Sequence, residues 1–114
     1  LACADLAEPD LAGRTPRITA AHVAHLEGVC DRLQAGLPEL KRFILPGGVP
    51  LGAQLHLART VARRAERRVI ELGAAEALNV ELLKYLNRLS DALFLLARQA
   101  NLDQGEAEAH PDYA

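Results

Sequence analysis

Several residue types are absent or scarce in this chain. It contains no methionine and no tryptophan, two cysteines in 114 residues, and only 4% aromatic residues. Cys3 and Cys30 lack the spacing of a metal or redox motif, so we expect both to be small buried hydrophobes in a reducing compartment, the cytoplasm. No apolar run approaches the ~20 residues of a membrane span, and no secretory signal is visible. Because methionine is absent, we expect further residues upstream of Leu1.

What the chain does contain favours helix. Half of its residues are hydrophobic and 25% are charged, and the dominant alanine and leucine are strong helix formers. We therefore predict an all-α fold, an up-and-down helical bundle, with one domain over residues 1–102 and a flexible acidic tail over 103–114. The formal net charge of −2 gives no indication of nucleic-acid binding.

Capping residues and helix breakers divide the chain into segments. Threonine, asparagine and proline are typical of helix starts, and glycine is typical of helix ends. The predicted segments are the helix end Leu1–Ala7, the loop Glu8–Arg17, a helix capped by Thr19 that runs to about Gln34, the connector Gly36–Gly48, a helix from Pro50 to Leu72 that Gly73 stops, and a last helix capped by Asn79.

Apolar residues recur in steps of three and four along each full helix, which predicts the packing seams of a bundle. The alanines in the middle of the second seam would allow a neighbouring helix to approach closely. The first seam is Val23, Leu26, Cys30, Leu33 and Leu37. The second is Leu51, Leu55, Ala58, Ala62, Ala65, Val69 and Leu72. The third is Leu82, Leu86, Leu89, Leu93, Leu96 and Ala100.

A polar stripe accompanies the second seam. Arg59, Arg63 and Glu66 recur at i, i+4 and i+7, so they share one face of the helix. Arginine presents a planar fork of donors that matches phosphate oxygens, and two arginines one turn apart could hold a di- or triphosphate. A solvated face with intrahelical pairing is the simpler explanation of the same spacing.

The last helix has a polar set of its own. Asn87 and Asp91 share a face, where the amide could contact a ligand or fix the register between helices. Arg88 and Asp91 are spaced to pair with each other. Of the two phenylalanines, Phe94 fits the core, whereas Phe43 either anchors its connector or packs against a flat ligand. Neither a zinc site nor a nucleophilic triad can be argued from the spacing.

Three segments together resemble the PduO-type ATP:cob(I)alamin adenosyltransferases, in that family's order and spacing. They are Arg42–Gly48 (RFILPGG), Leu55–Val69 (LHLARTVARRAERRV) and Leu83–Arg98 (LKYLNRLSDALFLLAR), and Ala4–Gly36 also resembles the family's middle region. The resemblance implies a five-helix bundle that assembles as a homotrimer, with sites between subunits. It implies transfer of the 5′-deoxyadenosyl group from Mg-ATP to cob(I)alamin, giving adenosylcobalamin and triphosphate.

The resemblance also implies roles for individual residues. Phe43 would lie beside the corrin and hinder the lower axial ligand of cobalt, and Asp91 would lie near the corrin site. Arg59 would form a salt bridge across the subunit interface. Phe43, Arg59 and Arg63 form the implied catalytic set. The implied ATP contacts are Arg63, Arg64, Glu66, Arg67 and Asn87, and no residue is assigned as a metal ligand because Mg²⁺ would arrive with ATP.

The chain departs from the family's pattern in one respect. The glycine- and threonine-rich segment that wraps the ATP phosphates, and the long helix after it, are not in this sequence. The implied partners are ATP, cob(I)alamin, two further copies of the chain, and a flavin reductase or a cobalamin-dependent acceptor enzyme. The alternative is a non-catalytic helical module for oligomerisation or for binding polyanions or partner proteins.

Overall fold

A computed structural model describes residues 1–7, 16–39, 44 and 46–105. The described residues form four helices and no strand, which confirms the predicted all-α bundle. The predicted loop Glu8–Arg17 and acidic tail fall mostly outside them, as does Phe43. The helices are α1 (Ala2–Ala7), α2 (Ala20–Ala35), α3 (Pro50–Ala75) and α4 (Val80–Asp103).

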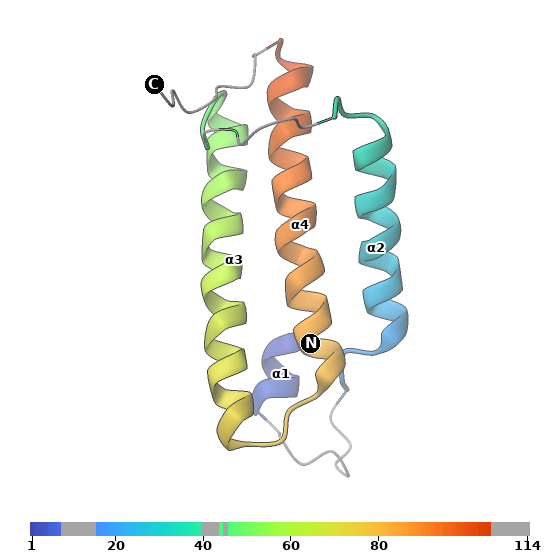
Figure 1. The fold of residues 1–114 in the computed structure, drawn as a ribbon, viewed down its shortest axis with the longest axis vertical. Coiled ribbons are helices and arrows are strands. Elements are labelled where there is room, and N and C mark those ends of the chain that lie inside the picture. The colour runs from blue at the N-terminus through green and yellow to red at the C-terminus, as the bar shows by residue number, and fades with distance from the viewer. Residues whose placement is uncertain (8–15, 40–43, 45, 106–114) are drawn as a thin grey trace.

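Helix α4 is the middle element of the bundle. Figure 1 shows α2 and α3 on either side of α4, with α3 running antiparallel to it and α2 parallel. The short α1 lies near the start of α4, at the lower end of the view. The molecule measures 51 × 29 × 24 Å, so the long helices set its length. None of the helices in the described residues combines the length and the hydrophobicity that a membrane span needs.

Most predicted helix ends are confirmed. Thr19 is the N-cap of α2, where its backbone N–H donates to Nδ1 of His22 at 2.9 Å. Asn79 caps α4 by accepting from the N–H of Glu81 at 3.1 Å, and Pro50 occupies the first turn of α3. These side chains satisfy or remove donors that a helix start leaves without partners.

The prediction that Gly73 stops α3 is wrong. The helix continues through Gly73 to Ala75, and the N–H of Glu76 donates to the carbonyl of Leu72 at 2.9 Å. Gly73 does not adopt a positive φ. A glycine inside a helix costs only about 1 kcal/mol, and the following alanines favour helix strongly enough to continue it.

The core consists of two small clusters on opposite parts of the α2–α4 contact. One contains Ile18, Val23 and Leu82, and the other contains Cys30, Ala92 and Leu95. The predicted seam of α2 is confirmed, because Val23 and Cys30 are buried and the rest of the stripe is half-buried. Cys30 is buried as predicted, whereas Cys3 is exposed, so the prediction for Cys3 is wrong.

The predicted seams of α3 and α4 need correction. Leu51, Ala65, Leu72 and Leu96 are exposed. The buried residues of α3 are Gly52, His56 and Val69. Because α4 packs against helices on two sides, its buried positions spread around it and are Leu82, Ser90, Ala92, Leu95, Ala97, Arg98 and Asn101.

A buried carboxylate joins α1 to the start of α4. Asp5 is 3% exposed and accepts from the backbone N–H of Ile18 at 3.0 Å, Nη1 of Arg17 at 2.9 Å and Nδ2 of Asn79 at 2.7 Å. Asn79 Nδ2 also donates to the carbonyl of Ile18 at 2.8 Å. We call Asp5, Arg17, Ile18 and Asn79 the base network, because it ties segments far apart in sequence at one end of the bundle.

A buried amide fixes the opposite end. Asn101 accepts from the N–H of Val49 at 3.0 Å and donates to the carbonyl of Gly47 at 2.9 Å. A Cβ atom at Gly48 or Gly52 would collide with the Asn101 side chain, and Gly48 also has a φ of 102°. The glycines therefore allow the start of α3 to close around one side chain of α4.

Candidate functional site

The predicted polar stripe forms one face of α3. We call Arg59, Arg63 and Glu66 the α3 stripe. Arg63 is exposed, while Arg59 and Glu66 are half-buried. The neighbouring Arg64 and Arg67 are also exposed. Within the part of the chain that the structure describes, the only ion pair on α3 joins Arg68 to Glu71, outside this stripe. The stripe therefore presents cationic donors to solvent, which suits an anionic ligand.

Arg59 differs from the other arginines because it lies over an aromatic ring. Its guanidinium carbon is 5.0 Å from the centroid of the Phe94 ring on α4. His56, one turn earlier on α3, meets the same ring edge-on, with centroids 5.9 Å apart and planes at 67°. This geometry is typical of cation–π and edge-to-face contacts. Phe94 is half-buried, so the prediction that it belongs to the core holds only in part.

The register of α3 against α4 follows from two contacts. Gly52 lies against Asn101, and Arg59 lies over Phe94, so each helix advances seven residues between the contacts in opposite directions. Another seven residues, about two turns, bring Glu66 level with Asn87. Glu66, the last residue of the α3 stripe, and the predicted ATP-contacting amide of α4 therefore lie at the same height in the bundle.

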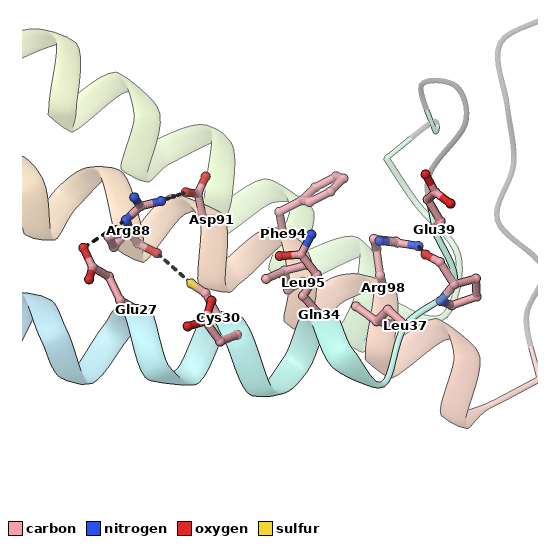
Figure 2. A pocket seen from close by; sticks show the side chains of 12 residues that line it. Glu27, Cys30, Gln34, Leu37, Glu39, Arg88, Asp91, Phe94, Leu95 and Arg98 are labelled. Carbon is pink, nitrogen blue, oxygen red and sulfur yellow. Dashed lines mark hydrogen bonds and ion pairs between the residues drawn. The ribbon is translucent and has the colours of Figure 1, made fainter.

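A pocket of about 670 Å³ opens between α2, the following connector and α4. Its size is within the usual range for a small-molecule site. Figure 2 shows Phe94 and Asp91 of α4 extending to one side of it, with Arg98 directed at the connector. The lining consists of Glu27, Cys30, Asp31, Gln34, Leu37, Pro38, Glu39, Arg88, Asp91, Phe94, Leu95 and Arg98.

Charged groups in the pocket are held by short contacts. Arg88 lies 3.5 Å from Glu27 through Nε and 3.2 Å from Asp91 through Nη1, so the predicted pairing with Asp91 is confirmed. Arg98 is 3% exposed and donates from Nη2 to the carbonyl of Pro38 at 2.7 Å. The Cys30 thiol donates to the carbonyl of Arg88 at 3.7 Å, and burial raises its pKa, with Asp91 adding to the effect.

The pocket combines apolar walls with an acidic excess. Its four carboxylates face two guanidinium groups, one of which is paired with two of those carboxylates. Such a lining repels a polyanion and suits a neutral or amide-bearing ligand, because carboxylates accept hydrogen bonds from amide N–H groups. The chain thus separates a cationic face on α3 from an acidic pocket beside α2, with Phe94 between them.

Sequence reasoning placed some site residues and missed others. The structure brings Asp91 into the pocket and puts Arg59, Arg63 and Glu66 on one face, whereas Phe43 lies outside the described residues. Sequence reasoning missed the part that His56, Phe94 and Arg98 play in the site. One signal was available, since Asn87, Asp91, Phe94 and Arg98 recur at i, i+4, i+7 and i+11, which is one helical face.

Comparison with known proteins gives a consistent result. Residues 1–100 match the family model described as Cobalamin adenosyltransferase. The corrinoid adenosyltransferase of Mycobacterium tuberculosis is 56% identical over 89 residues, covering 76% of this chain and 46% of that protein. The corrinoid adenosyltransferase of Bacillus subtilis is 48% identical over 89 residues, covering 78% and 46%. The chain therefore spans about half the length of these curated relatives.

A solved structure has the same helical arrangement. It is a variant PduO-type ATP:corrinoid adenosyltransferase from Lactobacillus reuteri complexed with cobalamin and ATP, with a TM-score of 0.88 and 36% identity, covering 96% of this chain and 60% of that one. The family model over residues 1–100, the sequence match over 76% of the chain and the shared fold together identify its family: the chain belongs to the cobalamin adenosyltransferases.

Proposed function

We propose that the protein containing this chain transfers the 5′-deoxyadenosyl group of ATP to cob(I)alamin. Cobalt(I) attacks C5′ of ATP, a Co–C bond forms, the C5′–O bond breaks, and triphosphate leaves. The reaction takes its nucleophile from the corrinoid, so the protein contributes position and charge. The observation that carries this proposal is the placement of a cationic α3 stripe beside a separate acidic and apolar pocket, because two unlike substrates must meet.

In this proposal the phosphates of ATP bind to the α3 stripe and to the neighbouring Arg64 and Arg67. Arg63, Arg64 and Arg67 are exposed and can turn their forked donors to phosphate oxygens. Glu66 orients Arg63 or approaches the Mg²⁺ that accompanies the phosphates. Asn87, level with Glu66 on α4, supplies an amide to the nucleotide. In this arrangement α3 provides charge and α4 provides the directional contact.

The corrinoid occupies the pocket beside α2. Phe94 and Leu95 provide apolar contact there, and the carboxylates of Asp91 and Asp31 can accept from corrin amides. We place Phe43 against the corrin on the basis of the family resemblance, where it hinders the lower axial ligand of cobalt. Losing that ligand makes Co(II) easier to reduce to Co(I).

Assembly into a homotrimer with a fifth helix completes the proposal. Large apolar side chains on several faces of α3 are exposed in the single chain, and exposed apolar surface favours burial against other elements. They are Leu51 (60% exposed), Leu57 (64%), Val61 (48%) and Ile70 (55%). Arg59 then faces an acidic residue of a neighbouring subunit. A flavin reductase or a cobalamin-dependent enzyme is the proposed partner that supplies the electron or accepts the product.

Anaerobic spectroscopy tests this function. The whole protein, mixed with chemically reduced cob(I)alamin and Mg-ATP, should convert the cob(I)alamin spectrum to that of adenosylcobalamin and release triphosphate in equal amount. Omission of ATP is the control. Sedimentation at working concentration should show a trimer. A monomer that binds ATP without forming adenosylcobalamin would instead support a polyanion-binding module.

A further inference from the structure

We propose that Phe94 is a positioning residue that holds Arg59 for the adenosyl transfer. This inference rests on the proposed function and adds a residue to its machinery. The Phe94 side chain lines the pocket from α4, and the centroid of its ring also lies 5.0 Å from the Arg59 guanidinium carbon. One side chain therefore touches both the proposed corrin pocket and the cationic face.

The face of the Phe94 ring restricts the motion of the Arg59 side chain. Arg59 is half-buried in the middle of α3, and within the described residues no carboxylate lies at ion-pair distance from it. A free arginine samples many rotamers, and each partner that binds it must order the side chain again. The aromatic face attracts the guanidinium without neutralising it, so Arg59 stays ordered and keeps its charge for a further partner.

His56, on the same helix as Arg59, also contacts the Phe94 ring. It is 4% exposed and meets Phe94 edge-on at 5.9 Å, so the ring is packed between α3 and the pocket. Figure 2 shows Phe94 and Leu95 leaving α4 in different directions, and the contact with Arg59 places the Phe94 ring against α3. A ligand that enters the pocket and presses on Phe94 would shift the surface on which Arg59 rests. Corrin occupancy and the orientation of Arg59 are therefore coupled through one ring.

The test compares Phe94→Leu with Phe94→Tyr in the whole protein. Leucine keeps an apolar side chain and removes the aromatic face, whereas tyrosine keeps that face. We expect Phe94→Leu to lower kcat/KM for cob(I)alamin about fivefold, the equivalent of a cation–π contact of about 1 kcal/mol. Phe94→Tyr should recover most of this loss. On an Arg59→Gln background, Phe94→Leu should lower kcat/KM by less than it does in the wild type, because only its apolar contact with the corrin then remains to be lost.

A measurement without catalysis separates this inference from the proposed function. The Nε–H resonance of Arg59 should show an upfield ring-current shift that Phe94→Leu abolishes and Phe94→Tyr retains. Leu93→Ala removes apolar volume from the neighbouring half-buried position and should leave that resonance in place. Equal losses in the leucine and tyrosine variants, additivity with Arg59→Gln, or an unshifted resonance would each overturn the role of Phe94. Absence of adenosyl transfer by the wild-type protein would overturn the proposed function instead.

Discussion

Asp5 and Arg63 carry opposite charges and have opposite surroundings. Asp5 is 3% exposed and accepts from Arg17, Ile18 and Asn79 in the base network. Arg63 is exposed on α3 and has no ion pair with any described residue. The partners of Asp5 are inside the chain, so its charge serves the fold. The partners that would suit Arg63 are ligands, so its charge is available for function.

This contrast predicts that substitutions in the two regions separate into two classes. Loss of a buried charge leaves its former partners buried without compensation, which lowers the free energy of unfolding. Loss of an exposed charge changes folding little but removes a binding contact. The predictions that follow measure both properties for each variant.

The largest effect is expected for Asp5→Ala. Breaking a buried ion pair by removing one partner costs about 3–5 kcal/mol, because Arg17 and Asn79 lose the carboxylate that accepts from both and the buried N–H of Ile18 loses its acceptor. Chemical denaturation should show this decrease in the free energy of unfolding. Asp103→Ala is the matched control, since that exposed carboxylate accepts only from Gln99 among the described residues and should change stability by less than about 1 kcal/mol. Equal stability of the two variants would contradict the base network.

Arg63→Ala should affect binding instead. Removing a charged partner of phosphate costs about 2–5 kcal/mol of binding, so we expect the KM for ATP to rise at least about 30-fold, or turnover to be lost, with an unchanged melting temperature. Arg68→Ala is the control on the same helix, because Arg68 is exposed and pairs with Glu71 at 3.2 Å. Unchanged ATP kinetics in folded Arg63→Ala protein would exclude the phosphate role.

Local signals explain which parts of the structure were predictable. The caps at Thr19 and Asn79 and the first-turn Pro50 act within a few residues, so the sequence shows them directly. The face shared by Arg59, Arg63 and Glu66 also follows from helical spacing alone. The end of α3 was placed wrongly because Gly73 is a weak signal beside two alanines.

Contacts between distant segments explain the rest. Asn79 and Asp5 are 74 residues apart, and nothing near either residue indicates the other. The pocket needs α2, its connector and α4 together, and the place of Phe94 depends on the α3–α4 register. Periodicity gives the face of each helix but not its neighbour, so the apolar stripes overestimated the burial of Leu51 and Leu72.

Asn101→Ala tests whether the buried hydrogen bonds at the far end of the bundle stabilise the fold as those of the base network do. The variant leaves the N–H of Val49 and the carbonyl of Gly47 without their partner, which should cost about 1–3 kcal/mol of stability. Gly52→Ala should also destabilise, because its Cβ would collide with Asn101. The double variant should be less destabilised than the sum of the two, since alanine at 101 removes the collision. Strict additivity in denaturation experiments would show that Asn101 does not crowd Gly52.

The smallest effect on the free energy of unfolding is expected when the pH is lowered. Burial raises the pKa of Asp5, whereas the hydrogen bonds from Asn79, Arg17 and Ile18 lower it. The hydrogen bonds together have the larger effect, so the pKa of Asp5 lies below its ordinary value. The ionised form is therefore favoured by folding, and its contribution is fully present above the unfolded pKa of about 4. That contribution is lost as the pH falls from about 4 through the lower folded pKa, and stability should decrease over this window. Asp5→Asn has no carboxyl to titrate and should show a shallower acid slope than the wild type in urea denaturation at each pH. Parallel slopes would assign the acid sensitivity to other carboxylates. The contrast between the internally paired base network and the exposed α3 stripe would then be supported by the Arg63 variant alone.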